Sequence, residues 1–272
     1  MNNNCFVSII LPVYNAQNFV IDTIKSVKNQ TYHLLLIFIL FITTNICSSK
    51  FLSRSFFSKP SLSFIQITGK TLKKYINNKE YYLIDTREMA TIAQGFIPNS
   101  LIVPSTMFSF LYAVVPEGSK VIIISDETNY ITTLDSFVAL GKYKLIGYCI
   151  YDKIIQEASF NIQVVQYDPN TFESITKIVE EKQHIIDIRE ISEFKDTGVI
   201  KEAQLIPIST FLKDYKNIPS EGNVYVFCKS GGRATIGMSF MKRAGYLNKF
   251  IVMKGGMTQA IQEGYPVVPY EG

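Results

Sequence analysis

A duplication inside the chain is the feature that most limits its fold. Residues 83–88 (LIDTRE) return about 103 residues later as residues 185–190 (IIDIRE). Residues 120–124 (KVIII) return in the same way as residues 223–227 (NVYVF). The pattern in each copy predicts a strand, a short connection, a strand, a helix, a strand and a helix. This alternating order predicts an α/β fold, in which each copy is a mainly parallel sheet flanked by helices.

Two copies of this length are sufficient for two compact domains. We predict a first copy at residues 66–165 and a second copy at residues 172–272. The sequence Asp-Pro-Asn at residues 168–170 interrupts the pattern and predicts a turn between them. The chain is 47% hydrophobic and 18% charged, which suits folded domains with real cores and excludes a disordered tail.

Composition excludes several kinds of site. The formal charge of +4 is weak and the basic residues are scattered, so we expect no nucleic-acid partner. The four cysteines are far apart and form no CxxC pair, which argues against a disulfide framework or a zinc site. The chain has two histidines, His33 and His184, so any Cys-His or Ser-His catalytic pair must use one of them. We predict that Cys149 is a core residue and that the protein has no metal and no organic cofactor.

The first 32 residues form a separate fragment. Residues 7–13 (VSIILPV) predict a buried strand, and apolar residues at helical spacing follow it. Residues 1–32 resemble the opening strand–helix unit of family 2 glycosyltransferases, which have a nucleotide-sugar fold. That family also has acidic residues that contact the nucleotide and a DxD motif that holds a metal. This sequence contains neither DxD nor Asp-Asp, so glycosyltransferase activity is the weaker alternative.

An uncharged segment follows this fragment. Lys28 and Lys50 enclose 21 residues without charge, about the length of one bilayer crossing. Three explanations stay open for its apolar part, residues 33–49: a transmembrane segment, a secretory signal, or a junction between a truncated glycosyltransferase start and a foreign reading frame. Residues 50–65 are rich in Ser and Phe and are predicted to be a linker.

The chemistry-bearing motif is CKSGGR at residues 228–233. It stands between a predicted buried strand and a predicted helix, where open α/β sheets bind ligands. Backbone N–H groups in a glycine-containing turn form a nest for anions, and the helix adds the positive end of its dipole. Arg233 adds a permanent charge, and such surroundings favour a thiolate without a histidine base. The candidate site consists of Cys228 as nucleophile and of the binding-loop residues Lys229, Ser230, Gly231, Gly232 and Arg233.

These motifs resemble the rhodanese family of sulfurtransferases, whose active loop has a cysteine, four residues and an arginine. CKSGGR matches this loop, and residues 185–190 and residues 254–257 (KGGM) also fit. The resemblance covers about three quarters of the chain as a tandem pair. It is nearest to pairs that follow a metallo-β-lactamase-like domain, although the sequence contains no such domain. It implies that Cys228 takes sulfane sulfur from a donor such as thiosulfate, forms a persulfide, and passes the sulfur to a thiol or to cyanide.

Such a loop can also serve other functions. Dual-specificity phosphatases of the same fold have a loop one residue longer, wide enough for phosphate, whereas this loop has the size that suits sulfur. The main rival is a non-catalytic module that carries sulfur or senses redox state for a partner. The sequence names no protein acceptor. A reactive thiol is easiest to keep reduced in the cytoplasm, so we expect the catalytic region there, anchored to a membrane if residues 33–49 span one.

The first copy departs from the loop motif at residues 125–130 (SDETNY). Ser125 stands where the second copy has Cys228, and Tyr130 stands where it has Arg233. A serine without a base or a positive field is a poor nucleophile. Acidic residues also occupy this loop, so we predict that the first copy is catalytically silent and has a structural or docking role.

Residues that both copies keep are predicted to serve the scaffold. Asp187, Arg189 and Glu190 have counterparts in residues 85–88 of the first copy. We predict that these residues, together with Glu193, brace the fold through ion pairs and helix caps.

Overall fold

The computed structural model describes most of the chain beyond its N-terminal quarter. The described residues are 64–165, 175–246, 249–253 and 255–272. They all belong to one compact unit, Ser63–Gly272. Within these ranges, no helix is both long and apolar enough to cross a membrane.

Several sequence predictions lie outside the described residues. They concern the glycosyltransferase-like fragment at residues 1–32, the apolar segment at residues 33–49, most of the linker at residues 50–65, and the turn at residues 168–170.

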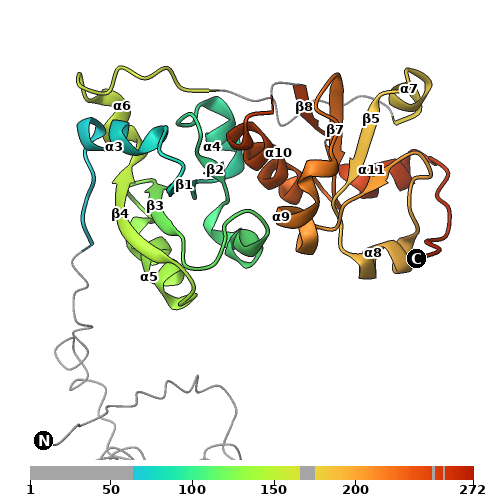
Figure 1. Cartoon of the computed structure of the whole chain (residues 1–272), viewed down its shortest axis with the longest axis horizontal. Helices are drawn as coiled ribbons and strands as arrows, with labels where there is room; N and C mark the ends of the chain where they lie inside the picture. Colours follow the sequence, from blue (N-terminus) through green and yellow to red (C-terminus); the bar gives the residue numbers. More distant parts are fainter. Residues whose placement is uncertain (1–63, 166–174, 247–248, 254) are drawn as a thin grey trace, which may run out of the picture. The chain divides into compact units, whose positions relative to one another are not determined.

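The first copy contains a parallel sheet with the strand order β2-β1-β3-β4 (Figure 1). Its strands are β1 (Tyr81–Asp85), β2 (Leu101–Ile102), β3 (Lys120–Ser125) and β4 (Lys144–Ile150). Its helices are α3 (Gly69–Ile76), α4 (Met89–Gln94), the 3₁₀ segment η1 (Ser105–Ala113), α5 (Tyr130–Ala139) and α6 (Tyr151–Gln156).

The second copy contains a parallel sheet with the equivalent order β6-β5-β7-β8 (Figure 1). Its strands are β5 (His184–Asp187), β6 (Gln204–Leu205), β7 (Asn223–Phe227) and β8 (Lys249–Val252). Its helices are α7 (Ile175–Glu180), α8 (Ile191–Thr197), η2 (Ile208–Thr210), α9 (Phe211–Asp214), η3 (Tyr215–Asn217), α10 (Gly232–Ala244) and α11 (Gly256–Gln262).

The two sheets repeat each other in detail. In the first copy, Phe96 pairs with Val165 in an isolated antiparallel bridge, and in the second copy Val199 pairs with Val268. Both partners are shifted by 103 residues, so the period seen in the sequence also sets the backbone pairing. The central strands β3 and β7 are buried along nearly their whole length, as expected of parallel strands covered by helices on both faces. The predicted α/β fold with parallel sheets flanked by helices is confirmed.

A buried ion pair braces each sheet at the end of its first strand. Arg189 Nη2 lies 2.7 Å from Asp187 Oδ2 and also donates to the carbonyl oxygen of Gly198. Arg87 and Asp85 form the same pair in the first copy, also at 2.7 Å. All four side chains are at most 4% exposed. Removing one partner of such a pair leaves a buried charge and destabilises a fold by about 3–5 kcal/mol, which agrees with the predicted bracing role.

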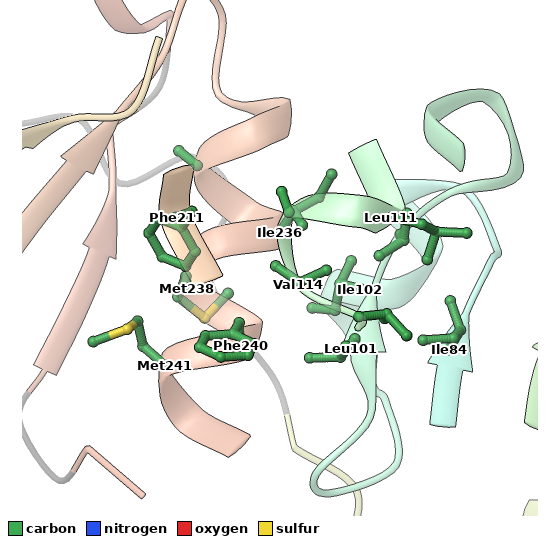
Figure 2. Packing of buried hydrophobic residues seen from close by; sticks show 14 of the residues in the cluster. Ile84, Leu101, Ile102, Leu111, Val114, Phe211, Ile236, Met238, Phe240 and Met241 are labelled. Atoms are coloured by element: carbon green, nitrogen blue, oxygen red, sulfur yellow. The ribbon is translucent and has the colours of Figure 1, made fainter. Parts of the chain in front are cut away.

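The two copies share one hydrophobic cluster, part of which is shown in Figure 2. Leu101 and Ile102 of β2 belong to it, and so do Ile236 and Phe240 of α10. The backbone N–H of Ile102 donates to Ser239 Oγ at 3.0 Å, so the edge strand of the first sheet is bound to a helix of the second copy. This helix, α10, is the one that begins in the candidate loop.

Arg243, near the C-terminal end of α10, also binds this helix to the first copy. Its guanidinium donates to the carbonyl oxygens of Asn99, Lys79 and Tyr81, the last at 2.7 Å. The Tyr82 ring lies under it, 4.6 Å from the guanidinium carbon. Cation–π contact and three hydrogen bonds together fix α10 against the first copy.

Candidate functional site

The candidate site begins where β7 ends. Cys228 directly follows this strand and is 1% exposed. The backbone N–H of Gly231 donates to Cys228 Sγ at 3.2 Å. Gly231 has a φ of +107°, in the left-handed region that favours glycine, and it is the N-cap of α10. The sulfur therefore faces the N-terminus of a helix of 13 residues, a position where the helix dipole stabilises a thiolate.

The six predicted loop residues lie together, but they differ in accessibility. Lys229 and Ser230 are exposed, whereas Gly232 and Arg233 are half-buried. Cys228 and Gly231 are buried at the base of the loop, and Lys229 and Ser230 are its solvent-facing part. A glycine-containing turn at a helix N-terminus can bind an anion through its backbone amides.

Arg233 is held by a carboxylate. Its Nη2 lies 2.7 Å from Glu193 Oε1, and its Nη1 also donates to Glu193 Oε2, which makes the pair bidentate. The hydrogen bond from Arg233 lowers the pKa of Glu193. The pKa of Arg233 is raised, first by its hydrogen bond to Glu193 and then by the charge and hydrogen bond of Cys228. The guanidinium, which belongs to the same loop as Cys228, thus forms an ion pair with the Glu193 carboxylate.

Glu193 also caps the helix in which it lies. The backbone N–H of Glu190 donates to Glu193 Oε2 at 2.9 Å, completing a capping box at the start of α8. The prediction of a scaffold role for Glu193 was therefore incomplete, because the same carboxylate positions Arg233. The sequence carried a signal for this role. Glu193 is the third residue of α8, whereas the third residue of α4, the equivalent helix of the first copy, is Thr91, so only the copy with the cysteine has the carboxylate.

The N-terminus of α11 fixes the loop from another side. The backbone N–H of Met257 donates to the carbonyl oxygen of Cys228 at 2.9 Å, and that of Thr258 donates to the carbonyl oxygen of Lys229 at 3.1 Å. Gly256 has a φ of +51°, and a methyl group there would lie 2.1 Å from the carbonyl oxygen of Cys228. A side chain at this position is therefore incompatible with the observed loop, so the loop requires glycine at residue 256. Lys254 of the same motif lies outside the described residues.

Residues of the first copy also reach the loop, and the sequence did not predict them. A methyl group built on Gly232 would lie 3.1 Å from Met107 Cε, so this side chain packs directly on the loop. The Phe110 ring centre lies 5.7 Å from the guanidinium carbon of Arg233. Both residues belong to η1, a 3₁₀ segment without the regular apolar spacing that would mark it in a sequence.

The corresponding turn of the first copy has a different structure. Ser125 is buried at the end of β3, and Asp126 Oδ1 accepts hydrogen bonds from the backbone N–H of Asn129 and from Thr128 Oγ1, both at 2.7 Å. Burial raises the pKa of Asp126, but these hydrogen bonds outweigh it and lower the pKa overall. Tyr130 stacks on Tyr148 with 5.0 Å between ring centres. A carboxylate therefore occupies the turn where the second copy presents amides to a sulfur.

The remaining chemistry-bearing residues lie elsewhere. Cys149 is fully buried in β4, as predicted, and burial raises the pKa of its thiol. Among the residues that the structure describes, no group of three or more His, Cys, Asp or Glu side chains is arranged to hold a metal ion.

Comparison with known proteins finds matches to the second copy. Residues 171–263 match the family model of the rhodanese-like domain. A sulfurtransferase from Allochromatium vinosum is 27% identical over 88 residues, which are 32% of this chain and 80% of that protein.

Solved structures give matches of the same kind. One is the thiosulfate sulfurtransferase from Pseudomonas aeruginosa, which is 15% identical with a TM-score of 0.33. The match covers 76% of this chain and 44% of that protein. Another is a rhodanese-related protein from Thermoplasma volcanium, with 28% identity and a TM-score of 0.31 over 36% of this chain and 100% of that protein.

Proposed function

We propose that the protein is a sulfurtransferase in which Cys228 carries sulfane sulfur as a persulfide. The observation that carries this proposal is the position of Cys228 Sγ, which accepts a hydrogen bond from the Gly231 amide at the N-terminus of α10. The match of residues 171–263 to the rhodanese-like domain supports it. In this proposal residues 172–272 are the active domain, and residues 66–165 are a second rhodanese-like domain that is catalytically silent.

The first step loads the cysteine. The Cys228 thiolate attacks the outer sulfur of a donor such as thiosulfate, a new S–S bond forms, and the S–S bond of the donor breaks. Sulfite leaves with the electron pair of that bond, and the outer sulfur stays on Cys228 as a persulfide anion. Charge is conserved, and the step needs neither an oxidant nor a metal. The amides of residues 229–233 and the guanidinium of Arg233 stabilise the anionic donor and the persulfide.

The second step unloads the cysteine. A thiolate or cyanide attacks the terminal sulfur of the persulfide, and the Cys228 thiolate leaves with the electron pair. The products are a new persulfide or thiocyanate, and the enzyme returns to its starting state. Because the leaving group is again a thiolate at a helix N-terminus, the same amides and dipole assist both steps.

The test uses the full chain with thiosulfate as donor and cyanide as acceptor. We expect mass spectrometry to find one added sulfur atom on Cys228 after incubation with thiosulfate, and we expect steady formation of thiocyanate. Cys228→Ser should reduce the rate by a factor on the order of 10³ or more, as expected for the loss of a nucleophile. Cys149→Ala is the matched control, since it removes a buried thiol outside the loop. Activity that persists in Cys228→Ser contradicts the proposal.

A non-catalytic sulfur carrier or redox-sensing module is the second candidate. The observation that favours it is the burial of Cys228, which is only 1% exposed. This candidate predicts that Cys228 gains a sulfur atom from thiosulfate without turning over with cyanide. Steady thiocyanate formation excludes it.

A further inference from the structure

Three side chains of the first copy lie at the loop of the second copy, and a fourth contacts Glu190 beside it. We call them the η1 wall. They are Met107, Phe110 and Tyr112 of η1, together with Met89 of α4. We propose that the η1 wall binds the body of the acceptor thiol and selects a thiol whose body is apolar and uncharged. This inference rests on the proposed sulfur transfer, and it assigns a substrate-selecting role to the copy that lacks the cysteine.

The first argument is contact with the helix end that faces the sulfur. A methyl group on Gly232 would meet Met107 Cε at 3.1 Å, Met107 Sδ at 3.2 Å and Met89 Cε at 3.6 Å. Gly232 directly follows Gly231, the residue whose amide donates to Cys228 Sγ. An acceptor that reaches this sulfur over the N-terminus of α10 therefore comes close to the two methionines. Their unbranched side chains adapt to ligands of different shape.

The second argument is that apolar surface remains accessible there. Met89, Met107 and Phe110 are half-buried, and Tyr112 is 41% exposed. Single exposed apolar residues are ordinary on protein surfaces. Here, however, Met107 packs on the loop itself, and the Phe110 ring lies beside the guanidinium of Arg233. The partly exposed apolar atoms thus border the groups that surround the nucleophile.

The third argument is the charge beside the wall. Arg233 is paired with Glu193, so the wall side of the loop offers no net positive charge from this pair. Glu190 lies at the other end of the wall, where it accepts hydrogen bonds from Tyr112 Oη at 3.1 Å and from Ser209 Oγ at 2.7 Å. The Glu190 carboxylate next to apolar side chains disfavours an acceptor whose body is anionic and leaves an uncharged apolar body as the best fit.

The acceptor step then follows with the wall as a positioning surface. The acceptor thiolate attacks the terminal sulfur of the Cys228 persulfide while its apolar body rests on Met107 and Phe110. The S–S bond of the persulfide breaks, Cys228 leaves as a thiolate, and the acceptor departs as a persulfide. Cyanide has no body to place on the wall, so it reports on the same chemistry without this contact.

The experiment compares three acceptors on the full chain loaded from thiosulfate: 2-phenylethanethiol, the anionic thiol thioglycolate, and cyanide. We expect a kcat/KM about tenfold higher for 2-phenylethanethiol than for thioglycolate. We also expect Phe110→Ala and Met107→Gln each to lower kcat/KM for 2-phenylethanethiol about tenfold, the size typical of a lost apolar substrate contact. The cyanide rate and the loading of Cys228 should fall by a clearly smaller factor, because cyanide and thiosulfate have no apolar body to place on the wall. Ile131→Ala is the matched control, because it truncates an exposed apolar residue of α5, which lies outside the η1 wall.

The outcomes separate this inference from the function on which it rests. Equal losses with cyanide and 2-phenylethanethiol, or no loss with either variant, would overturn the selecting role while leaving sulfur transfer intact. A wild-type protein that gains no sulfur atom on Cys228 would overturn both. If Phe110→Ala does not fold, Met107→Gln decides alone, since it keeps the length of the side chain and adds only a polar amide.

Discussion

The two copies share a backbone plan but differ in how they use the turn after their third strand. In the second copy, Gly231 turns its amide toward Cys228 Sγ, and Arg233 of the same loop is paired with Glu193. In the first copy, the Asp126 carboxylate accepts the amide of Asn129 and so fills its own turn. A nest of amides binds an external anion only when no internal carboxylate occupies it. The duplicated scaffold alone is therefore insufficient to bind an external anion at this turn.

Two of the residues that differ between the copies form an ion pair in the second copy. Arg233 is matched by Tyr130, and Glu193, the partner of Arg233, is matched by Thr91. Both members of the ion pair are thus absent from the equivalent positions of the first copy, whereas the buried Asp–Arg pair is present in both. We therefore expect the ion pair at the loop to serve the proposed chemistry and the buried pair to serve the scaffold.

Placing the first copy's residue in the active loop should have the largest effect. We expect Arg233→Tyr to lower the rate of thiosulfate-to-cyanide transfer about 100-fold, because one charged donor near the sulfur is lost. Arg233→Lys keeps the charge without the bidentate fork, so its loss should be smaller, about tenfold. Steady-state rates of the three proteins measure this. Equal rates for Arg233→Tyr and the wild type would mean that Arg233 does not stabilise the reacting sulfur.

Disturbing the contact beneath the loop should have the next effect. Gly256→Ala forces the loop to move, since the new methyl would lie 2.1 Å from the carbonyl oxygen of Cys228. We expect about tenfold lower activity and a free energy of unfolding lower by about 2–4 kcal/mol, measured by urea denaturation.

A glycine of the first copy provides the control for this variant. Gly118 also has a positive φ, +80°, but a methyl there meets nothing within 4 Å. Gly118→Ala should therefore lower the free energy of unfolding by only about 1 kcal/mol and leave activity unchanged. Equal effects of the two variants would show that backbone strain, rather than the collision with Cys228, accounts for the loss.

Removing the carboxylate that holds Arg233 should have a smaller effect that depends on pH. The pKa of Glu193 is lowered in the folded protein, so its contribution to stability is complete above the ordinary value of 4.5 and disappears as pH falls through the lowered value. We expect Glu193→Gln to lower the free energy of unfolding by about 1 kcal/mol at neutral pH. This difference should shrink when urea denaturation is repeated below the ordinary pKa. A difference that grows on acidification would contradict the lowered pKa.

Giving the first copy a thiol should have the smallest effect. Ser125→Cys in a Cys228→Ser background restores a cysteine at the end of β3, but the Asp126 carboxylate stays in the turn. We expect mass spectrometry to find no added sulfur atom on the introduced thiol, and we expect no measurable thiocyanate. Activity in this double variant would mean that the strand end and the helix suffice without the amide nest.

Much of the architecture followed from the internal repeat. The period of about 103 residues predicted two equivalent parallel sheets, because a repeated order of strands and helices imposes the same connections. The loop was also visible in the sequence, since the residues from Cys228 to Arg233 are adjacent in the chain. The double role of Glu193 was within reach of the same comparison, because the first copy has Thr91 at that position.

The η1 wall was not predictable in this way. Met107 and Phe110 lie more than 100 residues before the loop that they contact, and pattern analysis detects only neighbours along a strand or a helix. Their position depends on how α10 packs against β2, which is a property of the folded chain rather than of any local motif.

The contacts of Arg243 have a consequence for the evolution of the first copy. Its hydrogen bonds all end on backbone carbonyl oxygens, those of Asn99, Lys79 and Tyr81. Every amino acid supplies that oxygen, so substitutions at these three positions leave the hydrogen bonds available as long as the backbone path is kept. These three positions can therefore change their side chains without loss of the hydrogen bonds, whereas the side chains of the shared cluster, such as Leu101 and Ile102, stay constrained by packing against α10.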